Sequence, residues 1–127
     1  MQSYYGQIEK ETLENANFRK VIFTGKHSQL VLMSLKAGEE IGEEVHNYVD
    51  QFFRFEQGQG KVVIDDNQFD VADGDAVVVP AGSRHNVINT GAEDLKLYTV
   101  YSPSNHPAGT VHATKAEADA AEEEHHH

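Results

Sequence analysis

Short β-prone runs fill the sequence between Phe18 and Tyr101, and turn signals separate each run from the next. One run, residues 30–35, is closely followed by an Ala-Gly pair, and another, residues 61–64, is followed directly by Asp-Asp-Asn. Gly, Asp and Asn supply the backbone conformations that tight turns require. This punctuation leaves no room for a long helix in this region and predicts an all-β sandwich or barrel.

The length of 127 residues favours a single domain. Residues 1–17 are polar, and we expect them to lie across the outside of the domain, with a short strand or helix at most. The domain itself is predicted to span 18–113. The Ala- and Glu-rich segment 114–124 has no apolar stripe, which indicates a short solvated helix or a frayed tail. Residues 125–127 are three histidines that look like the remnant of a purification tag, so they are excluded from the site argument.

Composition removes several classes of function. The absence of Cys excludes a disulfide scaffold, a thiolate zinc site and a cysteine nucleophile. The formal net charge of −11 argues against nucleic acid or anionic lipid as a partner. No apolar run reaches the roughly 18 residues that a membrane span needs, and the first residues lack the basic-then-apolar order of a secretory signal. We therefore expect no membrane association and a cytoplasmic location.

Strand alternation predicts which polar side chains face inward. Residues two apart leave the same face of a strand, so Glu44 and His46 point together. Gln51 shares a face with Phe53 and Phe55, while the charged pair Arg54 and Glu56 is expected to face solvent. His85 shares a face with Val87 in the same way.

Four of these side chains can meet at one end of a barrel: Glu44, His46, Gln51 and His85. Two imidazoles, a carboxylate and an amide oxygen make a reasonable site for a divalent metal ion. Asp50 is the alternative ligand if the register differs by one residue. Such a site would leave one or two positions for water or substrate, which is the open geometry of catalytic metal ions.

The two segments that carry these residues resemble the paired motifs of the cupin superfamily. The positions in register with the first motif are Gly38, Glu44, His46, Gln51 and Gly58. Those that match the second motif without a gap are Gly74, Pro80, Gly82, His85 and Asn89. The resemblance implies a small single-domain cupin, an all-β jelly-roll barrel (double-stranded β-helix). It also implies a homodimer, for which we nominate the strand expected at 18–24.

The first motif departs from the family pattern at two ligands. A typical cupin has His where this chain has Glu44, and Glu where this chain has Gln51. The single carboxylate is thus at the first ligand position and not at the third. The net charge of a site with a divalent ion is the same, but one imidazole nitrogen ligand is replaced by an oxygen ligand. The harder ligand set favours Mn or Fe, and Zn, Ni or Co still compete through their affinity order.

The reaction stays open, because a fold and its site scaffold do not fix a function. The first interpretation is a metalloenzyme of the dioxygenase, isomerase or lyase type that acts on a small oxygen-rich molecule, with His106 and Tyr48 as candidates for moving protons. A phosphorylated sugar is disfavoured, because the expected pocket strands carry only Arg54 and Arg84, which alternation directs away from the site. The alternatives are a non-catalytic module that binds a small molecule or metal, and a metal-free cupin in which Glu44 and Gln51 hydrogen-bond each other.

Overall fold

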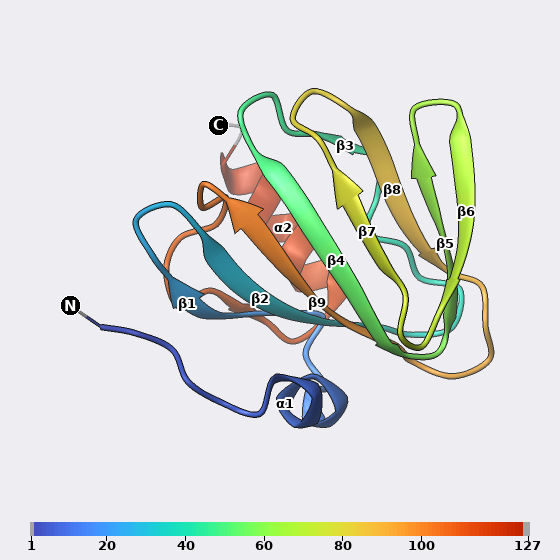
Figure 1. Cartoon of the computed structure of the whole chain (residues 1–127), viewed down its shortest axis with the longest axis horizontal. Helices are drawn as coiled ribbons and strands as arrows, with labels where there is room; N and C mark the ends of the chain where they lie inside the picture. Colours follow the sequence, from blue (N-terminus) through green and yellow to red (C-terminus); the bar gives the residue numbers. More distant parts are fainter. Residues whose placement is uncertain (1, 126–127) are drawn as a thin grey trace.

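Two antiparallel sheets form the body of the protein in the computed structural model, which describes residues 2–125 (Figure 1). The chain runs through α1 (Ile8–Glu14), β1 (Arg19–Thr24), β2 (Gln29–Leu35), β3 (Glu44–Val45), β4 (Asp50–Gln57), β5 (Gln59–Ile64), β6 (Asn67–Ala72), β7 (Ala76–Val79), β8 (Arg84–Asn89), β9 (Leu95–Ser102), β10 (Val111–His112) and α2 (Lys115–His125). Neither helix within the described range is long and apolar enough to cross a membrane. Of the presumed tag, His126 and His127 lie outside the described residues.

The order of the strands makes the fold a jelly roll, as the sequence predicted. One sheet has the order β10-β1-β2-β9-β4-β7, and the other has the order β3-β8-β5-β6. The chain crosses from the first sheet to the second after β2, returns at β4 and crosses again at β5, and β7, β8 and β9 then alternate between the two sheets. These crossings bring β3 and β8 of one sheet to face β4 and β9 of the other (Figure 1).

The core lies between the two sheets and follows the predicted alternation. Phe53 and Phe55 of β4 are fully buried, and so are Val87 of β8 and Leu97 of β9. Burying a side chain of this size contributes about 1.5–3 kcal/mol to stability. The inward faces of these strands are therefore fixed by their apolar residues, and the polar residues in register with them are carried inward as well.

The expected solvent exposure of Glu56 is wrong. Its side chain is only 5% exposed and accepts a hydrogen bond from Arg54 Nε at 2.6 Å, while Arg54 itself is 40% exposed. The β4–β9 register shifts between Phe55 and Gln57, which marks a bulge. Glu56 nevertheless lies on the same face as Arg54, and its burial comes from α1, whose Glu9 and Leu13 line a pocket together with Glu56.

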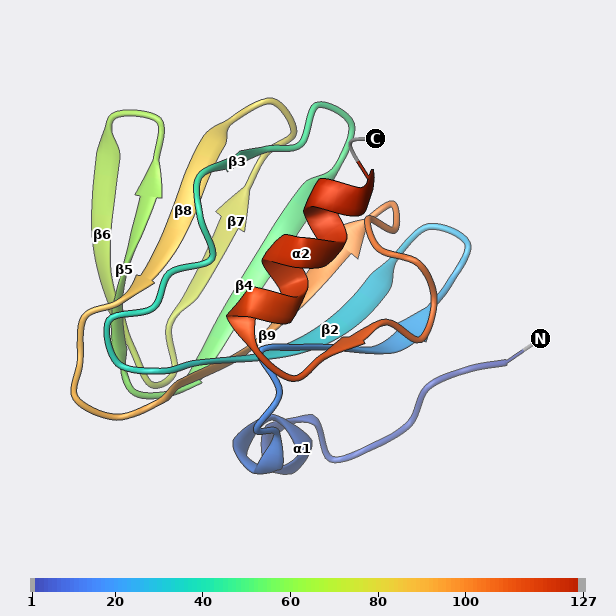
Figure 2. The same cartoon turned by 180° about the vertical axis from the view of Figure 1, so that it is seen from behind.

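The segments after β9 cover the inner face of the larger sheet, as Figure 2 shows for α2. Ala118 of α2 is 3% exposed and belongs to the core cluster, so this helix is not wholly solvated. The loop before β10 is fastened by the buried amide of Gln29, whose Oε1 accepts from the backbone N–H groups of Asn105 and His106 at 3.1 and 3.0 Å. Gln29 Nε2 donates to the His106 carbonyl at 2.7 Å, which completes the clamp.

The polar N-terminal segment lies outside the sheets and contains the short helix α1 (Figure 1). The backbone carbonyl of Asn15, just after this helix, accepts a hydrogen bond of 2.7 Å from Lys96 Nζ on β9. This end of the chain therefore packs against the outer side of the larger sheet, away from the polar side chains that lie between the two sheets.

Candidate functional site

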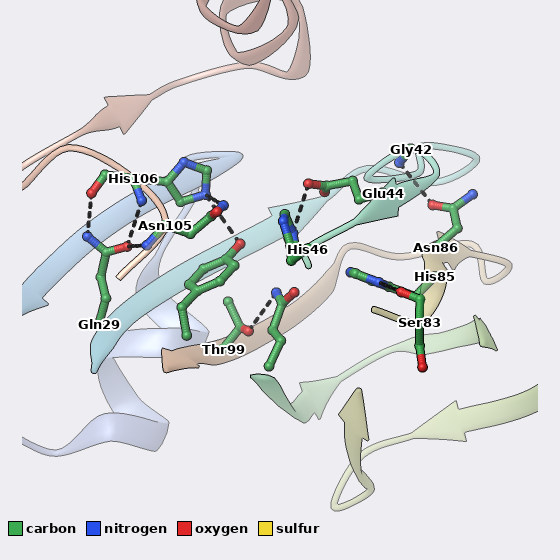
Figure 3. Close-up of polar contacts among 12 residues, drawn as sticks. Gln29, Gly42, Glu44, His46, Ser83, His85, Asn86, Thr99, Asn105 and His106 are labelled. Atoms are coloured by element: carbon green, nitrogen blue, oxygen red, sulfur yellow. Dashed lines mark hydrogen bonds and ion pairs between the residues drawn. The ribbon is translucent and has the colours of Figure 1, made fainter. Parts of the chain in front are cut away.

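Glu44, His46 and His85 lie close together between the sheets (Figure 3), and Gln51 of β4 reaches the same region from a third segment of the chain. Glu44 lies directly opposite His85 in the β3–β8 pair. His46 follows β3, and its ring centroid is 5.3 Å from that of His85. The backbone carbonyl of His46 accepts a hydrogen bond of 2.8 Å from Gly82 N–H, which fixes this loop to the turn before β8.

Gln51 enters the same space from β4, where it pairs with Tyr101 of β9. It is 3% exposed, and its Nε2 donates to the Thr99 hydroxyl at 3.0 Å. This bond turns Oε1 of the amide away from Thr99, and Oε1 is buried without a hydrogen-bond donor among the described residues. Asp50, the alternative ligand, is exposed and accepts from the backbone N–H of Ala81 at 2.8 Å. The register therefore places Gln51, and not Asp50, in the cluster.

The Glu44 carboxylate is ionised in this cluster. Burial alone would raise its pKa, but the adjacent His46 imidazole, with further contributions from Arg19 and His85, lowers the pKa below its usual value. Glu44 Oε2 lies 3.2 Å from His46 Nε2, close enough for electrostatic attraction. The two atoms are not aligned as a hydrogen bond, so Nε2 of His46 is also a buried polar atom with no hydrogen-bond partner in residues 2–125.

His85 is held in its neutral form with one ring nitrogen free. Burial lowers its pKa, which outweighs the raising effects of the Ser83 carbonyl and the Glu44 charge. Its Nδ1 lies 3.1 Å from the Ser83 carbonyl oxygen, and this partner assigns the proton to Nδ1. The lone pair of Nε2 is then available, in the arrangement that orients metal-binding histidines.

The four residues offer a chemically suitable donor set, although their side chains are not drawn together into a closed cage. No group of three or more His, Cys, Asp or Glu within the described part of the chain is arranged to hold a metal ion. The buried, unpartnered Gln51 Oε1 and His46 Nε2 nevertheless lie beside an ionised carboxylate. A cation placed among them would interact favourably with all three groups at once. The hydrogen bond between Glu44 and Gln51 that a metal-free cupin was expected to have is replaced by Glu44–His46 and Gln51–Thr99 contacts.

The two candidates for proton transfer occupy different surroundings. His106 Nε2 lies 3.3 Å from the Tyr101 hydroxyl, and the Tyr101 ring meets the His46 ring edge-on at a centroid distance of 6.0 Å. Burial, reinforced by the Arg19 guanidinium, lowers the pKa of His106 from 6.5 to about 4. Tyr48 is 88% exposed and projects into solvent. His106 therefore borders the cluster.

Arg19 is a buried cation that the sequence reasoning missed. It is 5% exposed, and its charge acts on Glu44, Tyr101 and His106. The prediction that disfavoured a phosphorylated sugar considered only Arg54 and Arg84 and is thus incomplete. Alternation in β1 could have found Arg19, because it shares a face with the buried Val21 while Lys20 between them is exposed.

Comparison with known proteins shows to which family the chain belongs. Its sequence is 54% identical over 122 residues to the uncharacterized protein YrkC of Bacillus subtilis, covering 91% of this chain and 66% of YrkC. It is 43% identical over 114 residues to an uncharacterized protein of Acanthamoeba polyphaga mimivirus, covering 87% of this chain and 71% of that protein. The crystal structure of BH2720 from Bacillus halodurans superposes with a TM-score of 0.92 at 46% identity, covering 94% of this chain and 95% of that one. Residues 31–101 match the Cupin_2 family, described as a cupin domain, and the chain therefore belongs to the cupin family.

Proposed function

We propose that this cupin binds one divalent metal ion through Glu44, His46, Gln51 and His85. We further propose that it is a metalloenzyme for a small oxygen-rich organic molecule, of the dioxygenase, isomerase or lyase type. The observation that carries the proposal is a pair of buried polar atoms, His46 Nε2 and Gln51 Oε1, that lack hydrogen-bond partners in the described structure and lie beside the ionised Glu44. Buried polar atoms are rarely left unpaired in native proteins, so an unfilled pair beside a carboxylate points to a cation.

The donor set suits Mn, Fe or Zn, and Ni or Co can compete. When bound, such an ion acts as a Lewis acid that polarises an oxygen of the ligand. The protein side chains supply orientation: the Ser83 carbonyl fixes the tautomer of His85, and the Thr99 hydroxyl fixes the direction of the Gln51 amide. Because Glu44 now approaches His46, closure of the site requires its carboxylate to move away from that contact.

Proton transfer is assigned to the side of the site where His106 meets Tyr101. Burial and the nearby Glu44 carboxylate raise the pKa of Tyr101 above its usual value, so the phenol keeps its proton. His106 is neutral near pH 7, and its Nε2 lies 3.3 Å from the phenol oxygen. The neutral imidazole can accept a proton from a bound ligand, so His106 is the favoured general base and Tyr48 the second candidate.

We also retain the proposal of a homodimer that uses the region of β1. This strand pairs with β2 on one side and with β10 on the other, so it is not an edge strand of the sheet. A dimer through this region would pack by its face, and light scattering after size-exclusion chromatography would give the mass. A monomer across the micromolar range would contradict this proposal.

Metal analysis of protein lacking residues 125–127 tests the site. After dialysis against Mn²⁺, Fe²⁺ or Zn²⁺ and then against buffer, we expect about one ion per chain in the wild type. We expect the same in His27→Ala, a control at an exposed histidine, and no ion in His85→Ala with its fold retained by circular dichroism. Absence of metal from the wild type would overturn the proposed site.

A substrate panel on the metal-loaded protein then distinguishes the two functional classes. Turnover of a hydroxy acid, enediol or β-diketone that is lost in His85→Ala supports the enzyme. Tight binding of ligand with no turnover would instead favour the non-catalytic module, because the same groups hold a ligand without transforming it.

A further inference from the structure

Arg19 is a buried guanidinium without a carboxylate in contact. One terminal nitrogen donates to Nδ1 of His112 at 3.3 Å, and the ion pairs found among residues 2–125 do not include Arg19. Its Nε is fully buried and has no acceptor within the described structure. Leaving a charged donor buried and unpaired is costly, so a side chain in this state marks a place for an acceptor that is not part of the fold.

A cavity of about 220 Å³ lies directly against Arg19. Its walls come from β1, the loop before β10, and α2, where the small side chains of Ala118 and Ala121 leave the space open. His106 and His112 also line it, and burial lowers the pKa of both. Both imidazoles are therefore neutral near pH 7, and Arg19 supplies the positive charge of the cavity.

The cavity is connected to the Glu44–His46 cluster through contacts between aromatic side chains. His106 lines the cavity and lies 3.3 Å from the Tyr101 hydroxyl, and the Tyr101 ring in turn meets the His46 ring. The charge of Arg19 also lowers the pKa of Glu44, so the two regions interact electrostatically. A ligand bound beside Arg19 would therefore act on the cluster through this charge and through the His106–Tyr101 contact.

The charges in this space are unbalanced once a metal ion is present. Glu44 and Arg19 offset each other when the cluster holds no ion. A divalent ion added to one carboxylate and one guanidinium leaves a net charge of about +2 between the sheets. Glu122 also lines the cavity, but it is exposed and screened by solvent. The buried charge therefore favours an anionic ligand, and its binding and that of the metal should reinforce each other.

We infer that Arg19 and the cavity beneath α2 form a carboxylate-binding subsite, so that the molecule this cupin takes is a small organic acid. The planar fork of one guanidinium matches the two oxygens of a carboxylate, and Nε with a terminal nitrogen can donate to both. A phosphate dianion usually recruits additional cationic groups, and His106 and His112 are neutral here. This inference deepens the proposed function and rests on it only for the contribution of the metal charge.

Calorimetric titration with malonate, and separately with inorganic phosphate, tests the subsite in metal-free and Zn²⁺-loaded protein. We expect malonate to bind, more tightly with Zn²⁺ present, and to lose about tenfold or more of its affinity in Arg19→Gln. Arg19→Lys should recover part of the loss, because it keeps the charge without the fork. The matched control is Arg84→Gln, whose side chain is 66% exposed and paired with Glu43, and it should bind as the wild type does.

The ¹⁵N resonance of Arg19 Nε in the wild type gives a second readout that does not depend on the stability of a variant. Malonate should shift this resonance in the metal-free protein, whether or not the chain binds metal. A site that takes up metal while malonate leaves both affinity and resonance unchanged would overturn the subsite and keep the metal proposal. Binding of phosphate in preference to malonate would overturn the assignment to a carboxylate. A shifted resonance in a chain that never binds metal would support the subsite and overturn the metal centre.

Discussion

Acid destabilisation should depend measurably on His106. Burial, with a further contribution from Arg19, lowers the pKa of this imidazole from 6.5 to about 4 in the folded protein. The charged and titratable groups that act on it include Glu44, His46 and His112. In the unfolded chain the imidazole takes up a proton near pH 6.5, so the unfolded state binds more protons between these values. The free energy of unfolding therefore falls as the pH is lowered through this window.

The size of the effect follows from the width of the window. Each pH unit between the two pKa values is worth about 1.4 kcal/mol, so acidification from pH 7 to pH 4 removes up to about 3 kcal/mol through His106 alone. Partial access of solvent to the ring reduces this figure. His85 and His112, whose pKa values are also lowered, add losses of the same sign. A variant comparison is therefore needed to isolate the contribution of His106.

Urea unfolding of metal-free protein at several pH values between 7 and 4.5 provides the assay. His106→Gln should lose stability less steeply with acid than the wild type, because its side chain has no proton to gain. The backbone groups of His106 that Gln29 holds remain in the variant. The control is His27→Gln, at an exposed turn, which should follow the wild type. Parallel curves for the wild type and His106→Gln, or an NMR titration of His106 with a midpoint near 6.5, would refute the reasoning.

Three further predictions concern the frame that holds the site. Phe53→Ala should lower the free energy of unfolding by about 3–5 kcal/mol in denaturant titrations, because Phe53 is fully buried in the core. Gly58→Ala should lower the melting temperature more than Gly74→Ala: both glycines have positive φ, but only at Gly58 would a Cβ meet backbone, at 2.8 Å from an oxygen. Asn89→Ala should cost about 3 kcal/mol in the same titrations, since its amide donates to two backbone carbonyls and accepts from a third backbone group.

The fold was predictable because its signals are local. Gly and Asp at turn positions divide the chain into strands, and the period of two correctly assigns the inward faces of Gln51 and His85. The prediction failed where another element covers the outer face of a strand. Glu56 shares its face with Arg54 but lies beside α1, and the period of two does not show where that helix docks.

The site was predictable in part for a different reason. The spacing of Glu44, His46, Gln51 and His85 identified the cluster, since motif positions fix which strands meet. Arg19 was not predicted to be part of the site, because a charged residue at the start of a strand is usually solvent-exposed. Its burial depends on α2 and on the loop before β10, and both segments lack a sequence pattern that predicts where they dock.

Burial alone does not separate functional polar residues from structural ones in this protein, whereas hydrogen-bond accounting does. Gln29 and Asn89 are as buried as Gln51, but their amide groups have partners on both the nitrogen and the oxygen. Replacing either of them should therefore reduce stability, because backbone groups lose their partners.

Gln51, His46 and Arg19 each keep a buried polar atom without a partner in the described chain. The folded state already includes the free-energy cost of burying those unpaired atoms. Removing such a side chain removes this cost together with the packing that the side chain contributes, so the two effects on stability offset each other. Their substitution should consequently impair the binding of a cation or an anion far more than it impairs folding. That contrast is the physical reason to search for the ligands of this cupin where its own hydrogen bonds are incomplete.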